Sequence, residues 1–238
     1  MPTTPTRVGY HLKEWQNANG QLIVSANTSF VPTEDVSIYA VWSPNSHTVT
    51  FEAQGGSGGD VSKLVTFDAP MPLTTPPKRT GYSFNGYFSA ANGGGTKYYT
   101  DGGTSARNWD IDESRLLYAK WTANQYTMHL DKAGGVGGSD SVTVTYDKTI
   151  PSIAIPKKGD QTSNTRYAFD GYYDRENGRG SKYFNNVGTG LMKWQYTGDI
   201  TVFANWVKQY VLSYEPDSWS LGDGETSLKT HGKVAYIK

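Results

Sequence analysis

Two stretches of the chain are nearly the same, GYSFNGYFSAANGGGTKYY at residues 81–99 and RYAFDGYYDRENGRGSKYF at residues 166–184. Aromatic residues hold matched positions in both, and Asn-Gly falls at the same offset. A shorter version, GYHLKEWQNANG, begins at Gly9. Each is followed by a segment that closes on Trp, namely SIYAVW at Trp42, LLYAKW at Trp121 and TVFANW at Trp206. Repetition at a period of roughly 80 residues indicates one structural module that is built several times.

A third element opens each unit. HTVTFEAQGGSGG begins at His47, YTMHLDKAGGVGG at Tyr126 and YVLSYEPDSWSLGDG at Tyr210, whereas the first unit has no such segment. We therefore expect residues 1–44 to be the C-terminal part of a truncated repeat, 45–123 and 124–207 to be complete repeats, and 208–238 to be the N-terminal part of a further repeat. A chain that starts and stops inside a repeat is expected to be a fragment of a longer array.

The opening element reads as a hairpin. In HTVTF the side chains alternate, so that Val49 and Phe51 share one face, and Met128 and Leu130 follow the same parity in the next unit. The glycine clusters at 55–59 and 134–138 permit a tight reversal, after which VSKLVTFD or DSVTVTYD runs back. The proline-rich crossing that follows disfavours a central strand or a long helix, which predicts a loop or one short helical turn.

The repeated GY segment predicts a second hairpin. Tyr82, Phe84 and Phe88 share one parity, which we assign to the core, and Tyr87 falls on the opposite face. Asn-Gly at 92–93, at 177–178 and at 19–20 predicts type I′ turns, whose two central residues both need positive φ. The closing strand places Leu117, Ala119 and Trp121 on its apolar face. The predicted fold is mainly β, or α+β with at most short helical turns, arranged as tandem small modules.

Composition and charge exclude several classes of function. The 238 residues carry 22 Lys and Arg against 22 Asp and Glu, so no net field would attract nucleic acid or an anionic membrane surface. There is no cysteine, which removes disulfides, thiolate catalysis and Cys-ligated zinc. No apolar run approaches the roughly 18 residues of a membrane span. We expect no nucleic-acid partner, no membrane insertion within this segment and no cofactor.

Taken together, the motifs resemble the Listeria–Bacteroides repeat, the B-repeat module of the internalin family. The resemblance rests on VTFEAQGG at 49–56, PPKRTGY at 76–82, the GY segment and LYAKW at 117–121, and it extends through the partial units. It implies β-grasp-like, ubiquitin-like domains that occur in tandem on secreted and cell-surface bacterial proteins as stalk or adhesion modules. It also implies that Trp15, Tyr87 and Tyr172 stand where the family often has Trp.

Two units depart from the family pattern. Thr165-Arg166 replaces the Arg-x-Gly lead-in that the chain shows at 7–9 and 79–81, and Glu14 stands where Gly86 and Gly171 occur in the other units. These departures concern local loop geometry.

The residues argue against an enzyme. GGSGG matches G-x-S-x-G at Ser57, but a nucleophile elbow needs a strand that runs into a helix, and a second hairpin strand follows here. The histidines fall at unrelated repeat positions without a metal-binding spacing or an obvious carboxylate partner, and are expected to be solvated: His11, His47, His129 and His231. The acidic residues of one loop lack the spacing of an EF-hand and are expected to be solvated too: Asp101, Asp110, Asp112 and Glu113. We expect no catalytic and no metal-binding residues.

Binding is the alternative to a pure spacer. Trp15, Tyr87 and Tyr172 fall opposite the predicted core parity, and exposed aromatic faces can stack on sugar rings or anchor a protein. If exposed, they would be the ligand-binding residues for a host or neighbouring-cell glycan or protein. The other interpretation is a second small cluster beneath the proline-rich crossing. Burial of the three rings would remove the support for binding.

The sequence thus predicts a noncatalytic tandem-repeat segment of a bacterial cell-surface or secreted protein, acting as a stalk and possibly in adhesion. It would lie outside the cell as part of a longer exported protein. We expect a monomer, with head-to-tail association of the truncated ends as the alternative. Short connections such as 43–45 predict little slack between one repeat and the next, and strands that run on across the junction.

Overall fold

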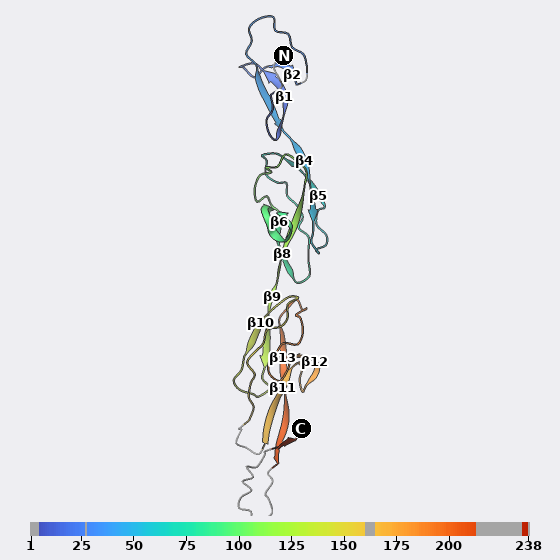
Figure 1. Ribbon diagram of the computed structural model, residues 1–238, viewed down its shortest axis with the longest axis vertical. Coiled ribbons are helices and arrows are strands. Elements are labelled where there is room, and N and C mark those ends of the chain that lie inside the picture. Colours follow the sequence, from blue (N-terminus) through green and yellow to red (C-terminus); the bar gives the residue numbers. More distant parts are fainter. Residues whose placement is uncertain (1–4, 27, 160–164, 213–234, 238) are drawn as a thin grey trace, which may run out of the picture. The chain divides into compact units, whose positions relative to one another are not determined.

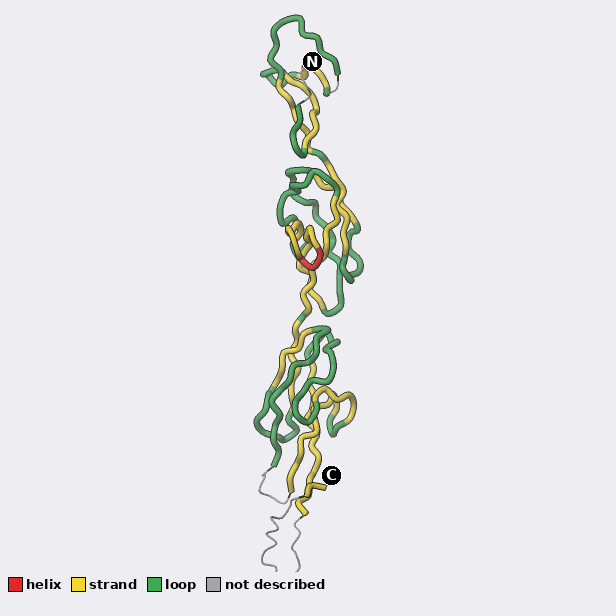
Figure 2. The backbone as a smooth tube through the Cα atoms, viewed as in Figure 1, coloured by secondary structure: helices red, strands yellow, loops and turns green. Residues whose placement is uncertain are grey.

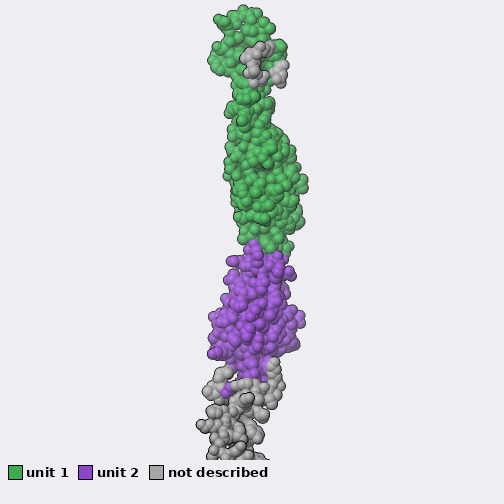
Figure 3. Space-filling model, in the orientation of Figure 1, with its two compact units in different colours: residues 1–122 green, residues 123–238 purple. Residues whose placement is uncertain are grey.

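The protein is mainly β. The structure is a computed structural model that describes residues 5–26, 28–159, 165–212 and 235–237 (Figures 1 and 2). Within those ranges the one helical element is a short 3₁₀ turn, η1 (Ala91–Gly93). The chain divides into two compact units, residues 1–122 and residues 123–238, which Figure 3 colours separately. The strands form three separate sheets.

The first sheet is built from the start of the chain. It contains β1 (Tyr10–Gln16), β2 (Leu22–Ser25) and β3 (Tyr39–Pro44) in the order β2-β1-β3, with both pairings antiparallel. No hydrophobic side chain in the described residues from 5 to 44 is fully buried. Because a small sheet needs a covered apolar face for independent stability, this segment depends on contacts beyond its own strands.

The second sheet belongs to residues 45–123. Its strands are β4 (Ser46–Glu52), β5 (Ser62–Thr66), β6 (Tyr82–Ala90), β7 (Gly94–Tyr99) and β8 (Arg115–Ala123), in the order β5-β4-β8-β6-β7. The two outer hairpins are antiparallel, whereas β4 and β8 are parallel, with Phe51 opposite Leu117. The proline-rich crossing between β5 and β6 is a loop, which is one of the two conformations that the sequence predicts.

The third sheet repeats this arrangement. β9 (Gln125–Asp131), β10 (Ser141–Thr145), β11 (Thr165–Arg175), β12 (Arg179–Phe184) and β13 (Ile200–Leu212) follow the order β10-β9-β13-β11-β12, and β14 (Ala235–Ile237) also pairs with β13. The parallel pair is β9 with β13. β13 continues through Trp206 into the opening segment of the next unit without a break, which confirms at this junction the prediction that strands run on.

Each five-stranded repeat has an interior of its own. Of the residues predicted to face inward on the opening and closing strands, Val49, Leu117 and Ala119 are fully buried in one cluster, with Phe51 and Trp121 partly buried against it, and Met128 and Leu130 lie in the other. Both interiors are centred on aromatic side chains, and the fully buried ones are Tyr87, Tyr99 and Trp109 in residues 45–123 and Tyr172, Tyr183, Phe184 and Trp194 in residues 124–207.

The parity of the GY strand differs from the sequence prediction. Tyr87 and Tyr172 are buried, with 1% and 0% of their surface exposed, whereas Phe88 is only partly buried. In β11 the cause is a β-bulge, because the pairing of β11 with β13 shifts register between Phe169 and Gly171, and Gly86 stands at the position of Gly171 in β6. One extra residue reverses every later side chain, so the faces exchange at this point.

The bulge needs glycine at its second position. The φ angle of Gly86 is +117° and that of Gly171 is +152°. A Cβ atom on Gly86 would lie 2.1 Å from the backbone oxygen of Tyr99, and one on Gly171 would lie 2.2 Å from that of Phe184. The GY strand and its hairpin partner therefore approach too closely for any side chain there.

The Asn-Gly turns form where the sequence predicts them. Asn92 and Gly93 have φ angles of 58° and 78°, and Asn177 and Gly178 have 60° and 69°. In both hairpins three residues lie between the last paired positions, Ala90 with Gly94 and Arg175 with Arg179, instead of two. The first unit differs: Gly20 has positive φ, but the turn is closed by the Asn17 side chain, whose Oδ1 accepts from two backbone amides.

Candidate functional site: the contact between the first two repeats

A single residue, Asn45, connects β3 to β4. Its backbone amide donates to the carbonyl oxygen of Gly9 at 2.8 Å, and its own carbonyl oxygen accepts from the amide of Phe67 at 2.8 Å. Gly9 precedes the first sheet and Phe67 follows β5 of the second. The connection is therefore hydrogen-bonded on both sides, and no free linker remains between residues 1–44 and residues 45–123.

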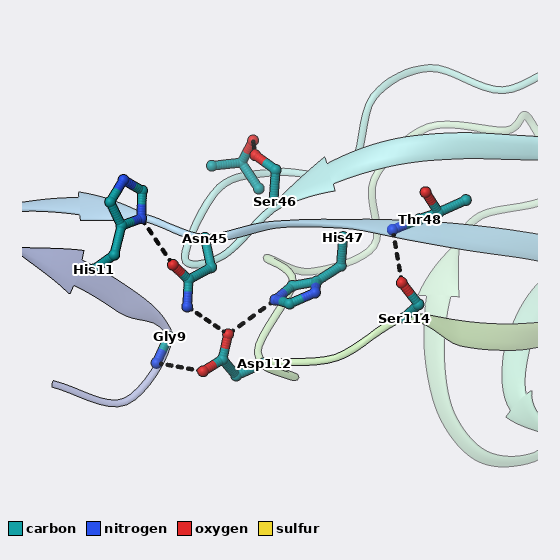
Figure 4. A network of polar contacts seen from close by, with 9 residues as sticks. Gly9, His11, Asn45, Ser46, His47, Thr48, Asp112 and Ser114 are labelled. Carbon is teal, nitrogen blue, oxygen red and sulfur yellow. Dashed lines mark hydrogen bonds and ion pairs between the residues drawn. The ribbon is translucent and has the colours of Figure 1, made fainter. Parts of the chain in front are cut away.

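The Asp112 carboxylate gathers the polar groups of this contact (Figure 4). Its Oδ2 accepts from the backbone amide of Gly9 at 3.1 Å. Its Oδ1 accepts from Asn45 Nδ2 at 2.8 Å and lies 2.8 Å from His47 Nε2. Hydrogen bonds from Asn45 and then His47 hold the pKa of Asp112 below its ordinary value of 3.8. One carboxylate thus joins the segment before the first sheet, the connecting residue and the second sheet.

The hydrogen-bond pattern fixes the protons on both histidines. Because the Asn45 amide nitrogen donates to Asp112, its Oδ1 is the group that faces His11 Nδ1 at 2.9 Å, so Nδ1 of His11 carries a proton (Figure 4). The carboxylate only accepts, so Nε2 of His47 carries one as well. The prediction of a solvated His47 without a carboxylate partner is wrong: Asp112 lies 65 residues away in sequence, and only the fold brings the two together.

An aromatic contact lies beside this network. The Tyr10 ring packs edge-on against Phe67, with ring centroids 5.7 Å apart, and its hydroxyl donates to Asp68 Oδ2 at 2.8 Å. The Arg7 guanidinium lies 3.9 Å above the centre of the same ring. The hydrogen bond to Asp68 is the main reason that the pKa of Tyr10 is raised.

Glycine is required at the entry to this contact. Gly9 has a φ angle of +78°, and a Cβ atom there would lie 2.3 Å from two carbons of the Phe67 ring. The Arg-x-Gly-Tyr lead-in therefore has a physical role, since it turns the chain and lets it approach Phe67. The same turn recurs at 79–82, where the amide of Tyr82 donates to the Arg79 carbonyl and Gly81 also has positive φ.

The loop that carries Asp112 is anchored to β4. Ser114 Oγ accepts from the amide of Thr48 at 3.1 Å (Figure 4). In the next repeat Asp199, at the position that corresponds to Ser114, accepts from the amide of Thr127 at 2.8 Å. The anchor thus recurs with a different side chain.

The other acidic residues of this loop do not converge on one point. Asp110 accepts from the Tyr98 hydroxyl at 2.6 Å and pairs with Arg107. Glu113 pairs with Arg115. Among the residues that the structure describes, no group of three or more His, Asp or Glu is placed to hold a metal ion. Ser57 is joined through its backbone to Lys78, and His129 is exposed on β9, whereas His231 lies outside the described residues.

The three aromatic residues singled out as ligand-binding do not form one exposed face. Tyr87 and Tyr172 are interior residues, so of the two interpretations that the sequence left open, exposed rings are excluded at these two positions. Trp15 on β1 is half-buried. The burial of Tyr87 and Tyr172 therefore removes the support for binding through these two rings.

The comparisons with known proteins agree with the repeat pattern. Residues 1–41 and 47–120 match the family model of the Listeria-Bacteroides repeat domain. This part of the chain belongs to the Listeria-Bacteroides repeat family, as its motifs imply. Residues 124–207 lie outside the matched ranges, yet their sheet has the same strand order and the same parallel central pair as residues 45–123.

Similar proteins occur in two bacteria. A protein of Evansella cellulosilytica described as a membrane protein is 28% identical over an alignment of 236 positions, which covers 93% of this chain and 30% of that protein. A second, described as a Gly-rich membrane protein, is 27% identical over 91% of this chain and 23% of its own length. Internalin H of Listeria monocytogenes is 32% identical over 52% of this chain and 21% of its own length. The chain thus spans less than a third of these relatives. In the described ranges, no helix has the length and apolar character needed to cross a bilayer.

Proposed function

We propose that the chain is a noncatalytic stalk segment of a bacterial surface or exported protein, in which folded repeats hold a functional part at a distance. The observation that carries this proposal is the Asn45 connection, which is hydrogen-bonded to the repeats on both sides. A stalk keeps a fixed length only if each module is held against the next, and a flexible linker would not hold them. The connection is one residue long, and hydrogen bonds, an aromatic pair and a shared carboxylate hold the two repeats together around it.

The interiors support the same proposal. Each five-stranded repeat buries its own aromatic cluster, so that one module does not need its neighbour's core in order to fold. We propose a β-grasp-like fold for these modules, in which a mixed sheet with a parallel central pair is covered on one face by the crossing loop. The membrane-protein and internalin names of the relatives support an extracellular location on a longer chain. An adhesive role through Trp15, Tyr87 and Tyr172 has less support, because two of these rings are buried.

Single-molecule stretching of the full chain tests the stalk proposal. Each complete repeat should open as one cooperative step that releases about 80 residues, or roughly 260–290 Å at about 3.3–3.6 Å per residue. Two such steps are expected, one for residues 45–123 and one for residues 124–207. Smooth extension without discrete steps would contradict the proposal, because a segment that opens gradually under load does not hold a fixed length.

A further inference from the structure

We propose that residues 124–207 contain a binding site for a neutral, hydroxyl-rich sugar ring. The site is a cavity of about 410 Å³, within the range of roughly 300–1,000 Å³ typical of ligand sites. Aromatic side chains form one part of its wall: Tyr167, Phe203 and Trp206. Charged and amide side chains form another: Asp131, Lys158, Glu176, Asn177 and Asn205. It is distinct from Tyr172, which is buried in the core.

Three differences from the preceding repeat create this space. The first is Ala133, which occupies the position of Gln54. The Gln54 side chain reaches across to the opposite hairpin, where its Oε1 accepts from the amide of Asn92 at 3.2 Å. Ala133 has nearly the same backbone conformation, with φ of 48° against 47°, but has no side chain to span the gap. The cavity lies where Gln54 would reach, beside Asn177.

The second difference is the cation that covers the lead-in tyrosine. Arg79 lies 3.9 Å above the Tyr82 ring and donates to the carbonyl of Gln54. Lys158 makes the corresponding bond to the carbonyl of Ala133 at 2.6 Å, but its ammonium is 5.5 Å from the Tyr167 ring. A lysine is narrower than a planar guanidinium and leaves more of the ring uncovered.

The third difference is Asn205, which replaces Lys120. In residues 45–123 the Lys120 side chain packs over the turn, so that a Cβ atom on Gly93 would lie 2.3 Å from it. Asn205 also lies over its turn, since a Cβ atom on Gly178 would lie 2.6 Å from its Nδ2, but it is the shorter side chain, and this Nδ2 donates to Asp170 at 3.0 Å. Its oxygen is therefore the group left to accept from a ligand.

The wall chemistry selects the class of ligand. The Nε1 of Trp206 donates to the carbonyl of Lys132 at 2.9 Å, so the polar edge of this residue is already used, and the Lys158 ammonium lies 5.7 Å from the centre of its ring. Asp131, Glu176 and the oxygen of Asn205 are acceptors, the ammonium of Lys158 carries only donors, and the amide of Asn177 provides both kinds of atom. A sugar ring has an apolar C–H face for the aromatic wall and hydroxyls that need both donors and acceptors. Because the wall carries both signs of charge, a neutral ligand fits better than an ion.

The test is an NMR titration of the full chain with the methyl glycosides of glucose, galactose, mannose and N-acetylglucosamine. At least one should bind in the millimolar range and shift the side-chain amide signals of Asn177 and Asn205 and the indole signal of Trp206. Ala133→Gln should weaken that binding at least about tenfold, because it restores the side chain that fills the space in the preceding repeat. Gln54 occupies the same backbone conformation, so this variant should keep its fold, and an unchanged spectrum away from the cavity checks that it does.

Gln54→Ala is the matched control, since it makes the reciprocal exchange in residues 45–123 and should leave binding at Asn177 and Asn205 unchanged. Three results would overturn the proposal. One is the absence of shifts at these signals with all four glycosides up to about 50 mM, far above a millimolar dissociation constant. Another is undiminished affinity in folded Ala133→Gln. The third is binding of tetramethylammonium in place of every glycoside, which would make the cavity a cation site.

Discussion

The backbone amide of Gly9 donates to the Asp112 carboxylate at 3.1 Å, across 103 positions of sequence. The bond joins the segment before β1 of the first sheet to the loop between β7 and β8 of the second sheet. The described residues from 5 to 44 contain no fully buried hydrophobic side chain. Contacts of this kind are therefore what we expect to hold the first unit in place.

Gly9→Ala should release the first sheet. The new Cβ would lie 2.3 Å from the Phe67 ring at a φ of +78°, so the lead-in must move away. We expect faster hydrogen exchange at the amides of Asn45 and Phe67, measured by NMR. Gly20→Ala is the control, because Gly20 has the same φ and its nearest contact is Gln16 Oε1 at 3.9 Å. The control should show only the backbone cost of about 1–2 kcal/mol, confined to its own turn. Equal effects of both variants at Asn45 would show that the Phe67 contact is unimportant.

Acid should weaken the same contact. The pKa of the Asp112 carboxyl is below its ordinary value of 3.8 in the folded protein, chiefly because Asn45 donates to it. A carboxyl with a lowered folded-state pKa contributes fully above its unfolded value and loses that contribution as the pH falls through the folded one. Exchange at Asn45 should therefore accelerate at low pH, after correction for intrinsic rates, and Asp112→Asn should remove this dependence. Glu113→Gln in the same loop serves as the control and should retain it.

Gly171→Ala should unfold one repeat and spare the other. The added Cβ would lie 2.2 Å from the Phe184 carbonyl, and backbone atoms cannot move aside as a flexible side chain can. We expect the free energy of unfolding of residues 124–207 to fall by more than about 2 kcal/mol, which exceeds the cost of placing an alanine at a positive φ angle. Signals from residues 45–123 in an NMR spectrum should be unchanged, since those residues have their own core. Gly137→Ala is the control, with φ of +68° and no atom within 4 Å of the added Cβ. Collapse of both repeats in Gly171→Ala would mean that their interiors are not independent.

Tyr172→Phe should be neutral or stabilising by up to about 1 kcal/mol. The Tyr172 hydroxyl is buried without a hydrogen-bond partner, and burial raises the pKa of this residue to about 12. Removing an unsatisfied polar atom from an apolar site relieves its desolvation cost. Tyr98→Phe is the contrasting variant, because its hydroxyl donates to Asp110 at 2.6 Å, and it should lose about 1 kcal/mol. Urea denaturation measures both, and a large loss in Tyr172→Phe would contradict the assigned surroundings.

The sequence predicts the hairpins well because their signals are local. The alternation that places Val49 and Leu117 inside, and the positive φ of Asn92 and Asn177, depend on neighbouring residues and are confirmed. The face of Tyr87 is predicted wrongly, because a bulge shifts the alternation by one residue. Gly86 and Gly171 are the signals that could have revealed it, since glycine inside a strand often marks a bulge.

The contact between residues 1–44 and residues 45–123 could not be read from the sequence. Asp112 belongs to an acidic loop with no spacing that suggests a partner, and His47 lies near the start of a strand 65 residues earlier. Such a pair meets only after both sheets have formed. The cavity beside Tyr167 was equally hidden, although the replacement of Gln54 by Ala133 within an otherwise similar turn is a visible difference between the repeats.

The most direct measurement is the distance distribution between two spin labels in the full chain, one at Ala18→Cys in the first sheet and one at Ala91→Cys in the second. Both alanines are exposed turn residues, and the chain has no cysteine of its own. If the contacts at Asn45, Asp112 and Phe67 hold residues 1–44 against residues 45–123, the distance distribution is a single narrow peak. Gly9→Ala should broaden that peak. A broad distribution in the unaltered chain would show that residues 1–44 move freely relative to residues 45–123 and would contradict the account.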